Sequence, residues 1–141
     1  MALHLAQQQF EEPGAALSLY DDDRVSMVAA KAYTRIVAAW KLNNKTAADL
    51  IAVSPRTWAR MKNGQWTGRL NRDQLLRVSA ITGLYKALHL FFGEKLADRW
   101  VGLRNRGPMF SGREPVETMI EGGLPAIMET RNYVDALRGG A

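Results

Sequence analysis

The sequence contains no cysteine and only five prolines in 141 residues. Without thiols the chain cannot form disulfides, use a cysteine nucleophile or build a cysteine-based zinc site. No stretch is apolar enough for a membrane span, and the opening MALHLAQQQFEEPG has neither the basic segment nor the apolar run of a signal peptide. We therefore expect a cytoplasmic protein.

Groups suited to catalysis are also sparse. The only histidines are His4 and His89, and each stands alone in the sequence. No Ser/His/Asp spacing, metal-ligand spacing or glycine-rich phosphate loop after a strand is present. An isolated histidine of this kind is usually a structural residue. The sequence thus predicts a protein that is not an enzyme and needs no metal or cofactor.

What is present is an ordinary apolar content of 47%, enough for a folded core, and an uneven distribution of charge. Residues 1–23 carry five acids and no base, residues 24–72 carry ten bases and one acid, and residues 73–141 carry nine bases and eight acids. A basic segment of net charge +9 is typical of a surface that binds phosphates. The alternative is a basic surface that is merely solvated.

Helix signals follow one another through the N-terminal half. Apolar residues recur every three or four positions over 25–40, directly after three acids, which indicates an amphipathic helix with acids at its positive end. A short helix is expected over 46–52. Ser54 fits the N-cap of a third helix and Pro55 its first position, and this helix should end at Asn63-Gly64.

The C-terminal half shows the same pattern. Asn71 and Gln74 have capping-box spacing and open a long helix that runs to Phe92. No period-two run survives for five residues, so the fold class is all-α, with an N-terminal bundle followed by a small helical domain. Further helices are expected over 94–103, from Glu114-Pro115 to Gly122-Gly123, and from Pro125 to Arg138.

The segment from Ala47 to Met61, AADLIAVSPRTWARM, resembles the helix-turn-helix of Xre-type regulators. In that motif two short helices cross steeply, which requires a small residue at their contact and apolar residues at fixed offsets. The departure is Ala52, where glycine is commonest, because a left-handed turn would cost alanine about 1 kcal/mol. An ordinary helical hairpin explains the apolar spacing, but not its coincidence with the basic segment.

If the motif binds DNA, its second helix enters the major groove. Arg56 and Arg60 are then the candidates for sequence readout, because arginine can bond bidentately to guanine. Thr57 and Asn63 are further candidates on the same helix, and Lys45, Ser54, Lys62 and Arg69 are expected to hold phosphates. The partner would be double-stranded operator DNA.

Trp58 has a different role in this interpretation. Its register places it with Met61 on the buried face, so core packing is favoured over base stacking. One recognition helix reads few base pairs, and such proteins work as two-fold dimers on inverted repeats. We therefore expect a homodimer.

An ordered series of residues marks the second half of the chain. It comprises Arg72, Leu75, Phe91-Phe92-Gly93, Ala97, Trp100, Asn105, Phe110, Gly112, Pro115, Gly122-Gly123 and a C-terminal helix ending in YVDALRGG. From Leu70 onward the chain resembles the toxin-binding domain of the MbcA/ParS/Xre antitoxin family. Together with the upstream motif, the resemblance covers about four-fifths of the sequence.

This resemblance implies the antitoxin of a type II toxin–antitoxin system. The partner would be a toxin of the RES class, which consumes NAD; the antitoxin would block its active site and repress the shared promoter. The implied organisation is a flexible acidic arm over 1–22, a DNA-binding domain over 23–69, and a toxin-binding and dimerisation domain over 70–141.

The last helix supplies the candidate toxin contacts. Arginine and tyrosine are enriched at binding hot spots, and arginine suits bidentate contact with partner carboxylates. A solvated helix face is the commoner outcome for such residues, and the resemblance favours the partner role. The candidates are Arg131, Tyr133, Arg138, Gly139 and Gly140.

Two alternative functions remain open from the sequence. One is a free-standing transcriptional regulator whose second half only dimerises. The other is an interaction module in which the helix-turn-helix is scaffold, and the basic segment favours DNA binding over it. Copurification of a toxin would separate the antitoxin from the regulator.

Overall fold

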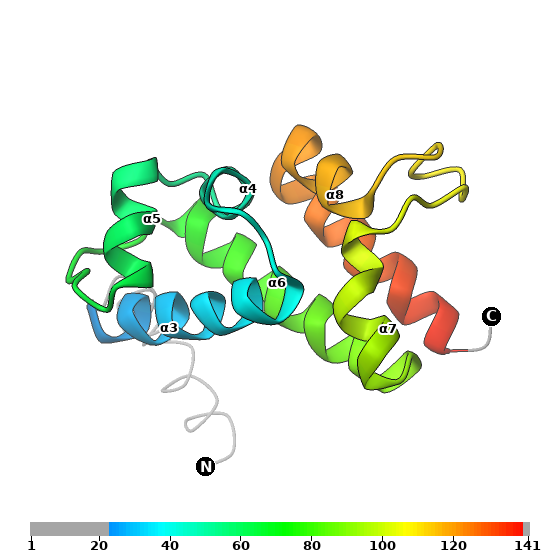
Figure 1. Cartoon of the computed structure of the whole chain (residues 1–141), viewed down its shortest axis with the longest axis horizontal. Helices are drawn as coiled ribbons and strands as arrows, with labels where there is room; N and C mark the ends of the chain where they lie inside the picture. The colour runs from blue at the N-terminus through cyan, green and yellow to red at the C-terminus, as the bar shows by residue number, and fades with distance from the viewer. Residues whose placement is uncertain (1–22, 140–141) are drawn as a thin grey trace, which may run out of the picture.

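The computed structural model describes residues 23–139, and this part of the chain contains six α-helices, one 3-10 helix and no strand. The expected all-α class is confirmed. The expected acidic arm, residues 1–22, lies outside the described residues. The elements are α3 (Asp23–Trp40), α4 (Asn44–Leu50), α5 (Pro55–Lys62), α6 (Arg72–Phe91), α7 (Glu94–Arg99), η1 (Trp100–Gly102) and α8 (Pro115–Arg138), shown in Figure 1.

Local capping determines where the helices begin. The backbone N–H of Thr57 donates to Ser54 Oγ at 3.0 Å, as expected for an N-cap. The N–H of Gln74 donates to Asn71 Oδ1 at 2.8 Å and the N–H of Asn71 donates to Gln74 Oε1 at 2.9 Å, which completes the capping box. Helix α4 begins two residues earlier than expected, because Asn43 accepts from the N–H of Thr46.

Helix α8 consists of two segments joined at Gly123. This glycine has φ 68° and ψ −153°, a conformation outside the helical region and open mainly to glycine. Pro125 lies just beyond it, where the second segment begins and a missing N–H costs little. The break expected at Gly122-Gly123 is therefore confirmed.

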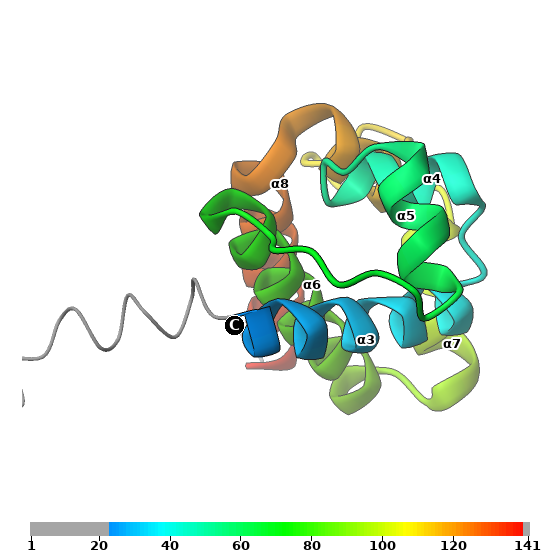
Figure 2. The same cartoon turned by 90° about the vertical axis from the view of Figure 1, so that its left-hand side faces the viewer.

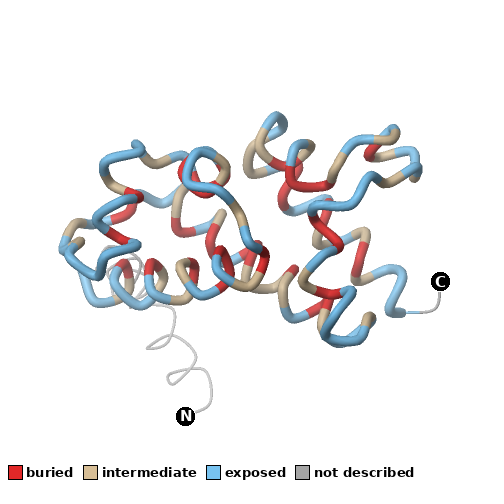
Figure 3. Tube along the Cα trace, in the orientation of Figure 1, coloured by how far each residue is buried: buried red, intermediate tan, exposed pale blue. Residues whose placement is uncertain are grey.

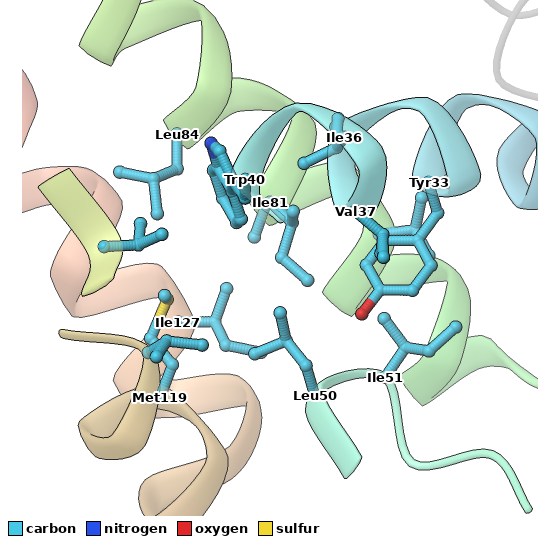
Figure 4. Packing of buried hydrophobic residues seen from close by; sticks show 14 of the residues in the cluster. Tyr33, Ile36, Val37, Trp40, Leu50, Ile51, Ile81, Leu84, Met119 and Ile127 are labelled. Carbon is cyan, nitrogen blue, oxygen red and sulfur yellow. The ribbon is translucent and has the colours of Figure 1, made fainter. Parts of the chain in front are cut away.

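Helix α6 lies at the centre of the fold, with α3 packed on one side and α8 on the other (Figures 1 and 2). Buried residues gather along the inner faces of these helices (Figure 3). In the core, Leu50 of α4 lies near Ile127 of α8, and Ile81 of α6 lies towards α3 (Figure 4). One apolar cluster thus includes side chains from both sides of the expected boundary at 69–70, and that boundary stays a prediction.

Within residues 23–139 no helix is both long and apolar enough to cross a membrane. The same part of the chain has no group of three or more His, Cys, Asp or Glu side chains that could hold a metal ion. His89 bonds to Asp98 at 2.8 Å across α6 and α7, which gives it a structural partner.

Candidate DNA-binding and partner-binding surfaces

The turn between α4 and α5 is tight and left-handed. Ala52 has φ 57°, the conformation in which glycine is commonest. The N–H of Ala52 donates to the carbonyl of Asp49 at 3.2 Å, and the N–H of Val53 donates to that of Ala48 at 3.0 Å. Gln74 Nε2 donates to the carbonyl of Ala52 at 2.8 Å, so α6 also holds the turn. The expected strained alanine, costing about 1 kcal/mol, is present.

Trp58 is the anchor that fixes α5 on the core. It is 2% exposed, and its ring meets that of Tyr33 edge-on at 5.6 Å. Its Nε1 donates to Asn44 Oδ1 at 3.0 Å, which satisfies its polar edge. Tyr33 is held in turn, since its hydroxyl donates to the carbonyl of Ala47 at 2.6 Å and burial raises its pKa. The prediction that Trp58 belongs to the core is confirmed.

The opposite face of α5 carries Arg56 and Arg60. Both are exposed, and their spacing of four residues puts them side by side one turn apart. Among the described residues neither has an ion pair or a side-chain hydrogen bond. Helix α5 lies at the surface of the molecule (Figure 2). Both guanidinium groups are therefore available to a ligand such as a base edge.

The other candidate DNA contacts are held to different degrees. Lys45 is exposed and donates to Asp49 at 2.8 Å, and Lys62 donates to Asn44 at 3.2 Å. Ser54 caps α5 and donates to Thr57 Oγ1 at 3.0 Å, so its hydroxyl is already engaged. Asn63 is exposed at the C-cap of α5. These residues gather on α4 and α5.

Arg69 is the exception in this group. Its Nε donates to Asp23 Oδ1 at 2.9 Å, which ties the loop before α6 to the start of α3. The basic residue is thus placed beside α3 and not on α4 or α5. The +9 charge of the segment gave no indication of this contact.

Tyr133 belongs to an aromatic cluster inside the second half of the chain. Its ring lies 6.3 Å from that of Trp100 and 5.3 Å from that of Phe110, and the side chain is half-buried. A Cβ added at Gly107 would come within 3.2 Å of the Tyr133 hydroxyl. Tyr133 therefore supports the loop after η1 as well as forming part of the last helix.

Arg131 packs on α6. Its guanidinium occupies the space that a Cβ at Gly83 would need, so the glycine permits this close approach. Asp135 lies 3.9 Å away on the same helix. Gly83 is an isolated glycine inside a helical pattern, and such a glycine indicates a close packing contact. Our sequence analysis did not use this signal.

The remaining candidates lie at the end of α8. Arg138 is exposed, 3.8 Å from Asp135, and Gly139 is the exposed C-cap. Positions 131 and 138 share a helix face, whereas position 133 points to the opposite one. The structure therefore brings the two arginines together and separates Tyr133 from them, while Gly140 lies outside the described residues.

The loop between η1 and α8 presents two exposed arginines that our sequence analysis did not select. The N–H of Asn105 donates to the carbonyl of Arg113 at 3.0 Å, and the N–H of Gly112 donates to that of Asn105 at 2.7 Å, which closes the loop. Asn105 Oδ1 also accepts from the N–H of Gly107 at 2.8 Å. Arg104 and Arg106, on either side of Asn105, are directed to solvent.

Comparison with known proteins shows what this chain is similar to. Residues 22–83 match the antitoxin Xre-like helix-turn-helix domain, past the boundary expected at 69–70 and into α6. The uncharacterized protein y4oB of Sinorhizobium fredii (strain NBRC 101917 / NGR234) is 32% identical over 130 residues, 92% of this chain and 98% of that protein. A chain in the crystal structure of the M. tuberculosis MbcT–MbcA toxin–antitoxin complex shares the fold, with a TM-score of 0.55 and 23% identity, over 79% of this chain and 95% of that chain. The chain belongs to one family with y4oB, and its residues 22–83 match the antitoxin Xre-like helix-turn-helix domain.

Proposed function

We propose that this chain neutralises a toxin of a type II toxin–antitoxin system by direct binding and represses its own operon by binding DNA. One observation carries the DNA-binding part: Arg56 and Arg60 are exposed, with no ion pair within residues 23–139, on a helix whose other face is fixed by the buried Trp58. A rigid helix that presents arginines in this way matches what the major groove requires. The protein would act in the cytoplasm.

In the DNA complex, α5 lies in the major groove with Arg56 and Arg60 towards base edges. Lys45 and Lys62 lie on α4 and α5, where they can hold phosphates on either side of the groove. Two copies related by a two-fold axis would read an inverted repeat, which is how single recognition helices gain enough sequence information.

For the toxin we propose a RES-class, NAD-consuming enzyme whose active site the antitoxin covers. The fold is shared with a chain from a crystallised toxin–antitoxin complex, which supports a toxin partner. The proposed contacts are the shared face of Arg131 and Arg138 with Gly139 and Gly140 at the chain end, where carboxylates of a partner can be bound bidentately. Neither binding event requires a catalytic residue.

Co-expression with the neighbouring open reading frame tests the function. We expect the neighbour to stop growth when expressed alone, to deplete NAD, and to copurify with this chain when both are present. Arg56→Ala/Arg60→Ala is the matched control, because it removes the proposed DNA contacts and should still rescue growth. A neighbour that neither binds nor harms the cell would favour a free-standing regulator.

A further inference from the structure

A groove runs between the first half of α3 and α6, on a side to which α4 and α5 contribute no lining. Its volume is about 750 Å³. Three cations, Arg24, Lys86 and Arg131, belong to its lining, and among the described residues no acid does. Most of its wall is apolar, formed by Val25, Val28, Ala29, Ala32, Leu75 and Val78.

The groove exposes one of two apolar faces of α3. Over its first half the core face consists of Ser26, Ala30 and Tyr33. The stripe that contains Val25 and Val28, which periodicity marked as apolar, turns into the groove, and Val28 is 69% exposed. A helix that is apolar on two faces is typically covered on both, and an uncovered apolar surface marks a site of interaction.

We propose that residues 1–22 of the same chain dock in this groove. The chain enters α3 at Asp23, directly before Arg24 of the groove lining, so the preceding segment starts at the groove. This segment carries four acids and no lysine or arginine, opposite in sign to the groove. It also contains Leu17, Leu19 and Tyr20, which suit an apolar wall.

The segment is long enough to cover the groove. The lining on α3 extends from Arg24 to Ala32, about 12 Å along the helix axis. An extended chain rises about 3.3 Å per residue, so 22 residues are several times longer than this distance requires. Because the segment is tethered, its effective concentration is on the order of millimolar, so even a weak contact is occupied most of the time.

A second copy of the chain fits the same surface less well. In a two-fold contact, groove faces groove, and the three cations of one copy would approach those of the other. Like charges brought together across a two-fold axis oppose such a contact. The acidic segment instead brings carboxylates towards these cations.

The natural absence of cysteine allows a direct test in the full chain. Ser18→Cys/Ser79→Cys places one thiol in the docking segment and one on an exposed groove position, and both substitutions are conservative. The matched control is Ser18→Cys/Ala59→Cys, with the second thiol exposed on α5. At low protein concentration we expect an intramolecular disulfide in the first pair at least about tenfold faster than in the second.

High salt should slow disulfide formation in the groove pair, because it screens the attraction between the segment and the cations. The groove pair should also be tested with its acids removed, by Glu11→Gln, Glu12→Gln, Asp21→Asn and Asp22→Asn together. Disulfide formation should then be severalfold slower at low salt. Circular dichroism on each variant verifies the fold. Equal rates for the two pairs would overturn the proposal, and so would disulfides that form only between molecules, which would assign the groove to a second copy.

Discussion

Helix α5 and the second segment of α8 both carry arginines expected at partner surfaces, and the two helices hold them differently. On α5, Trp58 fixes the helix on the core from one face, and Arg56 and Arg60 face solvent on the opposite face. On α8, Arg131 packs over Gly83 and Tyr133 stacks in an aromatic cluster. Substitutions on α5 should therefore separate folding from binding, whereas several on α8 change both.

The largest effect is expected at the anchor of α5. Trp58→Ala removes a buried ring and one of the two donors to Asn44 Oδ1, so it should cost about 3–5 kcal/mol of folding free energy. Denaturant unfolding measures this. A variant that unfolds like the parent and loses only DNA affinity would instead place this ring at the DNA surface.

A smaller loss is expected for the aromatic residue of α8. Tyr133→Ala should lower the free energy of unfolding by about 2–3 kcal/mol, because it opens a gap beside Trp100 and Phe110. Tyr133→Phe keeps the ring and serves as the control, with a change under about 0.5 kcal/mol. If Tyr133→Ala leaves the free energy of unfolding unchanged and weakens only toxin binding, then folding and binding are separable on α8 as they are on α5.

The exposed arginines of α5 should affect DNA binding alone. Arg56→Ala or Arg60→Ala should lose about 1–3 kcal/mol at one symmetric base position, with folding stability unchanged. Lys62→Ala is the comparison, since a phosphate contact weakens all sequences alike and reduces the salt slope by about 1. Fluorescence anisotropy on cognate and random duplexes measures both. Equal losses on the two duplexes for the arginine variants would show that base readout lies elsewhere.

The smallest effect concerns the turn between α4 and α5. Ala52→Gly relieves the left-handed strain at φ 57° and should raise the free energy of unfolding by about 0.5–1 kcal/mol. The matched control, Ala59→Gly on the exposed face of α5, should lower it by about 1 kcal/mol. Destabilisation by both changes would mean that Ala52 contributes packing that outweighs its strain.

Local signals predicted most of the fold. The N-cap Ser54, the capping box of Asn71 and Gln74, and the break at Gly123 all act through neighbours a few residues away, so the sequence carries them directly. The buried position of Trp58 followed from helical periodicity for the same reason.

Contacts between distant elements could not be predicted in this way. The packing of Arg131 on Gly83 joins helices whose relative position no local pattern determines. The ion pair of Arg69 with Asp23 and the exposure of Val28 depend likewise on how α3 meets α6. Periodicity predicted the buried positions of Ile36 and Trp40, but over the first half of α3 the core face is Ser26, Ala30 and Tyr33, and Val28 is exposed.

These contacts also change how the partner surface should be tested. A chain that ends at Gly123 lacks the second segment of α8. Ile127 and Val134 beyond it are 0% exposed in the core shared with α6, so that truncation would damage the fold. Single exposed side chains such as Arg138 are the suitable targets.

The central claim, that DNA and toxin bind separate surfaces of one scaffold, is tested by measuring both affinities on the same preparations. Arg56→Ala/Arg60→Ala should weaken operator binding by at least about tenfold and leave toxin binding unchanged, since each lost base contact is worth about 1–3 kcal/mol. Arg138→Ala should weaken toxin binding and leave operator binding unchanged. If either variant, still folded, loses both affinities in parallel, the two surfaces are not separate and the account is contradicted.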